Sequence, residues 1–177
     1  MALVVRRGGR WGTWARYGVG MSRIHVPISL RWSDLDAYGH VNNAEMLRLL
    51  EEARIRVFWA DAAAGEDAAP TAVIHGGPGA DTVTLIASQQ IEYLLPVPFV
   101  RQPLDVQLWI GRMGGASLEI CYEVCSPAGG EEQLVYTKAA TTLVLVDAAT
   151  QRPRRLSNAE RAAWAPHVEE PVTFRKR

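Results

Sequence analysis

The spacing of hydrophobic positions changes along the chain and divides it into distinct elements. Residues 25–33 alternate apolar and polar side chains, the period-two pattern of a strand with one buried face. Residues 44–60 instead repeat apolar side chains every three to four positions, which predicts an amphipathic helix. Its apolar stripe consists of Met46, Leu50, Ala53 and Val57, widened by Leu47, Leu49 and Phe58. Asn42 is placed to cap this helix, and Glu45 to complete a reciprocal capping pair.

Four more strand patterns follow a connection rich in Gly and Ala at residues 60–81, whose alanines are able to continue the helix to Ala69. The strands are expected at residues 82–94, 104–113, 117–125 and 133–146. Glycine-rich turns between them favour hairpins, and a short helix is expected from Ser157 to Trp164. One apolar helix against a curved sheet is a two-layer arrangement. We therefore predict an α+β fold in which a five-stranded, mostly antiparallel sheet wraps one long central helix.

Composition limits the classes of function. The 177 residues suit one domain, expected at residues 23–148 with a C-terminal extension at 149–177. Nineteen Lys plus Arg balance nineteen Asp plus Glu, which argues against a nucleic-acid-binding protein. Cys121 and Cys125 on one strand would lie about 13 Å apart, too far for a disulfide. Two reduced thiols with no histidine cluster predict a cytoplasmic protein without a zinc site.

The first 22 residues differ from the rest, because they hold arginines and no acidic residue. No stretch of the chain approaches the ~18 apolar residues that span a bilayer, and this segment lacks the apolar core of a signal peptide. We expect a disordered basic tail or an over-extended start, with Met21 as the true first residue. The alternative is an arm that touches a membrane or polyanion, because Trp11 and Trp14 lie beside arginines.

Candidate chemistry gathers where the predicted helix begins. Asp34, Asp36, His40, Asn42 and Asn43 lie close together in the segment RWSDLDAYGHVNNAEML. A helix N-terminus presents unpaired N–H groups and a partial positive charge, which can stabilise an oxyanion. A carboxylate beside it can act as nucleophile or general base. The alternative is purely structural, because Asp, Asn and Gly are also the usual residues of turns and caps.

The string DLDAYGHVNN, followed by a helix ending in LLEEAR, resembles the signature of hotdog-fold acyl-CoA thioesterases of the 4-hydroxybenzoyl-CoA thioesterase type. The runs IEYLLP and RMGGASLEICYEV fit the same pattern, and the resemblance covers about residues 24–147. It implies a hotdog fold that hydrolyses an acyl-CoA to a free carboxylic acid and coenzyme A, with no metal or organic cofactor.

The resemblance assigns roles by position. Asp36 matches the catalytic carboxylate that attacks the thioester or activates water, and the backbone N–H of Asn43 matches the group that polarises the carbonyl. Gly39 and Asn42 fall at substrate-binding positions. His40 and Asn42 fit the HVNN string of a plant acyl-carrier-protein thioesterase branch, in which an Asn stands where this chain has Tyr38. His40 is therefore a candidate catalytic residue outside a complete triad.

Other residues have weaker assignments. Arg112 and Ser117 flank a Gly-Gly turn at which such thioesterases often touch the phosphates of coenzyme A. Asp34 is expected to be structural. Glu51 and Glu52 lie where a sister hotdog group places a catalytic Glu, and with Asp36 present we expect them to form surface ion pairs.

Rival functions remain open at this level. An acyl-carrier-protein thioesterase and a non-enzymatic acyl-CoA-binding hotdog protein are alternatives. A hotdog hydratase fits poorly, because its Asp and His have four residues between them, whereas three lie between Asp36 and His40 and five between Asp34 and His40. Because an exposed sheet edge favours pairing, we also expect self-association as a dimer or tetramer. The sequence does not specify the acyl group.

Overall fold

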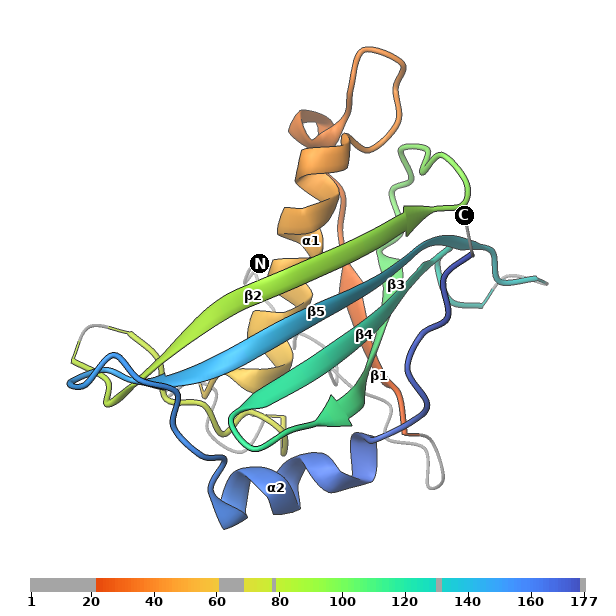
Figure 1. Ribbon diagram of the computed structural model, residues 1–177. Coiled ribbons are helices and arrows are strands. Elements are labelled where there is room, and N and C mark those ends of the chain that lie inside the picture. The colour runs from red at the N-terminus through yellow and green to blue at the C-terminus, as the bar shows by residue number, and fades with distance from the viewer. Residues whose placement is uncertain (1–21, 61–68, 78, 130–131, 176–177) are drawn as a thin grey trace, which may run out of the picture.

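The computed structural model describes residues 22–60, 69–77, 79–129 and 132–175. It consists of one antiparallel sheet with a helix on one face (Figure 1). The predicted basic tail up to residue 21, and residues 61–68 of the predicted helix extension, lie outside the described residues.

Five strands form the sheet in the spatial order β1-β3-β4-β5-β2. Their bounds are Ile24–Ile28 (β1), Thr82–Tyr93 (β2), Leu104–Met113 (β3), Ser117–Cys125 (β4) and Val135–Asp147 (β5). Every neighbouring pair is antiparallel, as predicted. The first strand is shorter than expected and is followed by a 3-10 turn at Trp32–Asp34. The cause is Asp34, whose carboxylate accepts the backbone N–H of Arg31 at 2.7 Å and turns the chain.

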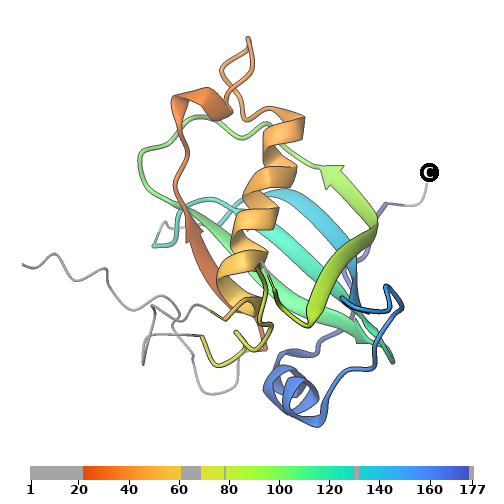
Figure 2. The ribbon, with the colours of Figure 1, turned by 90° about the vertical axis from the view of Figure 1, so that its left-hand side faces the viewer.

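The helix α1 spans Asn43–Phe58, 16 residues, and lies along one face of the curved sheet (Figure 2). It is shorter than the long central helix predicted. Trp59 already has an extended backbone, and the N–H of Ala60 donates to the carbonyl of Ile74. The N–H of Ile74 in turn donates to Phe58, so backbone pairing with this later segment replaces the next helical turn.

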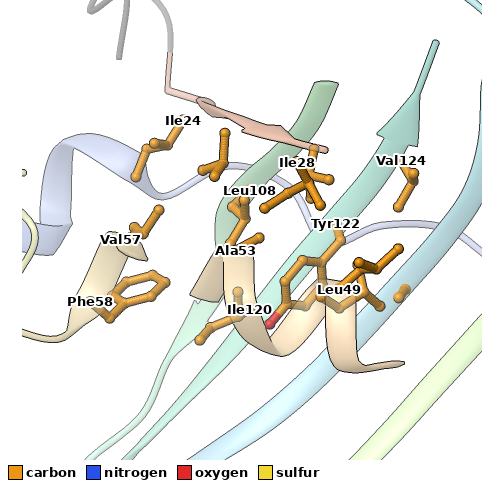
Figure 3. Close-up of a cluster of buried hydrophobic side chains, with 14 of the residues drawn as sticks. Ile24, Ile28, Leu49, Ala53, Val57, Phe58, Leu108, Ile120, Tyr122 and Val124 are labelled. Carbon is orange, nitrogen blue, oxygen red and sulfur yellow. The ribbon is translucent and has the colours of Figure 1, made fainter. Parts of the chain in front are cut away.

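The core lies between α1 and the sheet. Figure 3 shows Ala53, Val57 and Phe58 of α1 together with Ile120 and Tyr122 of β4. The alternation predicted for β4 is confirmed, because the four side chains of one face belong to this core: Leu118, Ile120, Tyr122 and Val124. Burial of this surface is the main stabilising contribution to the fold.

The C-terminal extension first closes one end of the core, where Trp164 packs edge-on against Phe58 of α1, and then crosses the other face of the sheet. A second helix, α2 at Asn158–Trp164, is capped by Ser157, and the indole N–H of Trp164 donates to the carbonyl of Thr71. Further on, the N–H of Val172 donates to the Sγ of Cys121 at 3.4 Å. Both cysteines are buried and are free thiols, as predicted for their redox state.

A histidine–aspartate pair on this outer face makes stability depend on pH. His25 Nδ1 lies 2.9 Å from Asp105 Oδ2, and this contact raises the pKa of His25 above its ordinary 6.5, although burial and Arg23 oppose the shift. Burial alone would raise the pKa of Asp105, but hydrogen bonds from His25, Gln133 and Gln107 lower it below 3.8. The pair therefore stabilises the fold most between these two ordinary pKa values. Its contribution is lost as pH rises through the raised pKa of His25.

We expect His25→Gln to lower the melting temperature more at about pH 5.5 than at about pH 8.5, because the imidazole loses its charge, and with it the attraction to Asp105, as pH rises through its raised pKa. Thermal denaturation of both proteins at the two pH values measures this difference. An equal loss at both pH values would show that the charge of His25 adds nothing to stability.

Candidate functional site

The polar segment before α1 folds into a tight hairpin. Asp36 donates its backbone N–H to the carbonyl of His40 at 2.7 Å, and Asn42 donates its own to Asp34 at 2.8 Å. Gly39 closes the turn with φ of +77°, a conformation that side chains with a Cβ rarely adopt. This conformation gives Gly39 a structural reason to be glycine in addition to the substrate-binding position that the resemblance assigned it.

The carboxylate of Asp36 shapes the tip of this hairpin. Its Oδ1 accepts the backbone N–H of Tyr38 at 2.8 Å and that of His40 at 3.1 Å. Its second oxygen, Oδ2, has no hydrogen-bond partner among the described residues, and the side chain is half-buried. One oxygen thus fixes the carboxylate in place while the other is left for a ligand or water.

Asp34 differs from Asp36 in its surroundings. It is 1% exposed, and its two oxygens accept the N–H and the Nε of Arg31. Both oxygens are therefore committed to the turn that ends β1, which is a structural role.

The start of α1 presents an unpaired amide. Asn42 caps the helix as predicted, because its Oδ1 accepts the N–H of Ala44 at 2.9 Å. Glu45 does not complete the capping pair and instead lies 3.3 Å from Arg48. The N–H of Asn43 donates to none of the described residues, and it points along the positive end of the helix dipole.

A residue that the sequence analysis missed reaches this point from the sheet. The hydroxyl of Tyr93, at the end of β2, donates to the carbonyl of Asn43 at 3.2 Å. Burial raises the pKa of Tyr93, so the hydroxyl remains protonated and able to donate. Its place within the IEYLLP run was the available signal, but only the fold brings β2 to the helix start.

The segment that follows β2 supports the hairpin. The N–H of Val41 donates to the carbonyl of Val97 at 3.0 Å, and His40 forms an isolated bridge with Pro98. The ring of Phe99 then stacks on Trp32. The side chain of His40 is half-buried and has no hydrogen-bond partner among the described residues. Asp36 and His40 therefore belong to one hydrogen-bonded hairpin, which leads directly into Asn43 at the start of α1.

Arg112 and Ser117 are not part of this unit within one chain. The ladder pairs Leu104 with Ile28 next to the hairpin, whereas Arg112 and Ser117 lie at the other end of β3 and β4. The strand between Leu104 and Arg112 is about 27 Å long at ~3.4 Å per residue. Arg112 lies 3.9 Å from Glu119, its partner in the ladder.

The glutamates of α1 form ion pairs on the helix surface. Glu51 lies 3.5 Å from Arg54, and Glu52 pairs with Arg56. Their carboxylates are therefore already engaged with cations of the same helix.

A cavity of about 480 Å³ opens at the far end of the sheet, by the start of β2 and α2. Its cation, Arg154, is already held by Glu160 at 2.5 Å and by Thr82 at 2.7 Å. Among the described residues, no three His, Cys, Asp or Glu side chains are grouped to bind a metal ion. None of the described helices is long and apolar enough to cross a membrane.

Comparison with known proteins gives the class of this chain. The chain belongs to the Thioesterase-like superfamily, whose family model matches residues 30–171. The matched region contains the hairpin, α1 and β2–β5. Among proteins with curated functions, none matches this chain.

Solved structures of related shape share the fold. A Pseudomonas aeruginosa protein, PA2801, proposed to be a thioesterase, is 29% identical with a TM-score of 0.56, covering 80% of this chain and 95% of that one. A Xanthomonas campestris protein proposed to be an acyl-CoA thioesterase is 26% identical with a TM-score of 0.56, covering 75% and 97%. A Thermus thermophilus thioesterase, solved with coenzyme A and zinc, is 24% identical with a TM-score of 0.59, covering 85% and 98%.

Proposed function

We propose that this protein hydrolyses an acyl-CoA to a free carboxylic acid and coenzyme A. The observation that carries the proposal is the hairpin before α1, which holds a carboxylate with one uncommitted oxygen at its tip and an unpaired amide at its base. Membership of the Thioesterase-like superfamily supports the same reaction, as does a Thermus relative that binds coenzyme A.

In the proposed mechanism, the N–H of Asn43 donates to the thioester oxygen as it gains negative charge. Asp36 acts on the carbonyl carbon in one of two ways. As a nucleophile it forms an acyl anhydride and expels the thiolate, and water then releases the acid. As a general base it takes a proton from water, whose oxygen attacks the carbonyl, and the proton passes to the leaving thiolate. Both routes require an ionised Asp36 and an oxyanion contact at the helix start.

The supporting residues have distinct proposed roles. Tyr93 holds the first turn of α1 against the end of β2 through its hydrogen bond to Asn43. Asn42 caps the helix and so fixes the direction of the first helical N–H groups. His40 is proposed to position water, because its backbone already fixes Asp36. Arg112 and Ser117 lie at the opposite end of β3 and β4 and are not part of the catalytic unit, and their assignment to the phosphates of coenzyme A stays a prediction.

Location and assembly belong to the proposal. We propose that the protein acts in the cytoplasm, which its two free thiols, Cys121 and Cys125, favour. We also propose that it self-associates through the edge strand β2.

The direct test is an assay of free thiol release from a panel of short, long and aromatic acyl-CoA thioesters. Hydrolysis of at least one acyl-CoA, with the matching acyl-carrier-protein thioester hydrolysed more slowly, is the expected result. Binding of coenzyme A without hydrolysis of any thioester would contradict the proposal and favour a non-enzymatic binder.

A further inference from the structure

An exposed aromatic stack lies beside the catalytic hairpin. The rings of Trp32 and Phe99 are 4.7 Å apart between centroids and inclined by 18°, so they lie almost face to face. Trp32 is nevertheless 77% exposed, because only one face of its indole rests on Phe99. A single exposed aromatic side chain is common, whereas apolar side chains that form a contiguous exposed patch often mark an interaction site.

Two arginines flank this stack. The antiparallel pairing of β1 with β3 ends at Ile28 opposite Leu104. Beyond this pair the Trp32–Phe99 contact keeps the two segments together, and both arginines are close to it along the chain: Arg31 directly precedes Trp32, and Arg101 follows Phe99 by two residues. Both arginines are exposed, and Arg31 is directed by its contact with the buried Asp34.

The surface formed by Trp32, Phe99, Arg31 and Arg101 is called here the aromatic platform. An exposed ring with two exposed arginines close to it along the chain is complementary to a purine that carries phosphates. Bases stack on exposed aromatic side chains, and guanidinium groups bind phosphate oxygens in pairs. An apolar chain or an uncharged sugar would contact the aromatic rings but leave both guanidinium groups without an anion.

We propose that the aromatic platform binds the adenosine phosphate end of the coenzyme A thioester, with adenine on the free face of Trp32 and the phosphates at Arg31 and Arg101. This inference rests on the proposed function, because it concerns the same substrate. The platform is joined to the hairpin through the contacts of Val97 with Val41 and of Pro98 with His40. It therefore lies at the hairpin end of the sheet, whereas Arg112 lies at the opposite end and beside Glu119.

Binding to the full-length protein tests the platform without catalysis. Isothermal titration with coenzyme A and with adenosine 3′,5′-bisphosphate should show dissociation constants about tenfold higher for Trp32→Ala than for the unchanged protein. Arg101→Gln should weaken both by a similar factor without removing the stack, so it tests the platform even where Trp32→Ala folds poorly. The matched control is Arg152→Gln, an exposed arginine in the turn at the far end of β5, which should change neither constant.

Kinetics with two substrates separate the platform from the catalytic hairpin. Trp32→Ala should raise KM about tenfold for an acyl-CoA and leave kcat unchanged. With the same acyl group on pantetheine, which lacks the adenosine phosphate, Trp32→Ala should leave both constants unchanged. An equal loss with both thioesters would overturn the proposal, because a merely structural role would affect both.

Three further outcomes are decisive. Unchanged binding in both Trp32→Ala and Arg101→Gln overturns the proposal. A rise in KM confined to Arg112→Gln also overturns it, because the phosphates would then bind at the β3–β4 turn at the opposite end of the sheet. A fall in molecular mass on Trp32→Ala also overturns it, because the stack would then be covered by a second copy of the chain. If no thioester is hydrolysed but Trp32→Ala still weakens binding of coenzyme A, the platform is supported and only the proposed hydrolysis fails.

Discussion

Asp36→Asn is expected to lower the turnover of the hydrolysed acyl-CoA by about 10²–10⁴-fold, the range for a positioned acid–base group. The amide keeps an oxygen that can accept the N–H groups of Tyr38 and His40, so the hairpin is retained. It loses the negative charge that either proposed route requires. Steady-state assays of thiol release measure the loss, and an unchanged Kd for coenzyme A shows that the substrate site is intact.

The matched control is Asp34→Asn, the same chemical change two residues earlier. Because both oxygens of Asp34 contact Arg31 in a buried position, this variant should lose thermal stability while keeping most of its turnover. His40→Ala should have an intermediate effect on turnover. Near-normal turnover in Asp36→Asn, combined with loss in Glu51→Gln or Glu52→Gln, would place the catalytic carboxylate on α1.

The sequence predicts those elements whose pattern of apolar and polar residues lies within the element itself. Strand periodicity placed β2 to β5 within about two residues of their observed bounds, because alternation is imposed by one buried face. The end of α1 was not predictable. Alanines at residues 60–69 favour helix, but the chain turns away at Trp59 because backbone groups of Phe58 and Ala60 pair with Ile74. That pairing comes from a segment 14 residues later, and no local pattern encodes it.

The same division applies to the candidate site. The hairpin residues are consecutive, so their proximity and the cap formed by Asn42 follow from the sequence itself. Tyr93 and the segment 97–99 reach the hairpin only through the order of the strands, in which β2 is an edge and the chain then crosses to β3. Arg112 and Ser117 were associated with the site by resemblance, but the register of β3 sets them at the far end.

The edge strand β2 carries the second large expected effect. It has 12 residues and pairs only with β5 in the described sheet, so its other side presents about 40 Å of unpaired backbone. Apolar side chains in its first half are also uncovered: Leu85 is 52% exposed and Ile86 41%. A long, apolar and unpaired edge of this kind promotes association with another strand. A second copy of the chain, related by a two-fold axis, offers the same strand in antiparallel orientation.

We therefore expect the unchanged protein to have the mass of a dimer or a dimer of dimers at micromolar concentration, and Leu85→Lys with Ile86→Lys to convert it to monomers. Each substitution places a cation on the edge, and the two-fold axis brings the cations of both copies close together, so repulsion adds to the loss of apolar contact. Ile55→Lys is the matched control, because Ile55 is similarly exposed but lies on α1. Light scattering coupled to size exclusion measures all three masses. A monomeric mass for the unchanged protein, or a double variant that keeps the mass of the dimer, would show that β2 is not the interface.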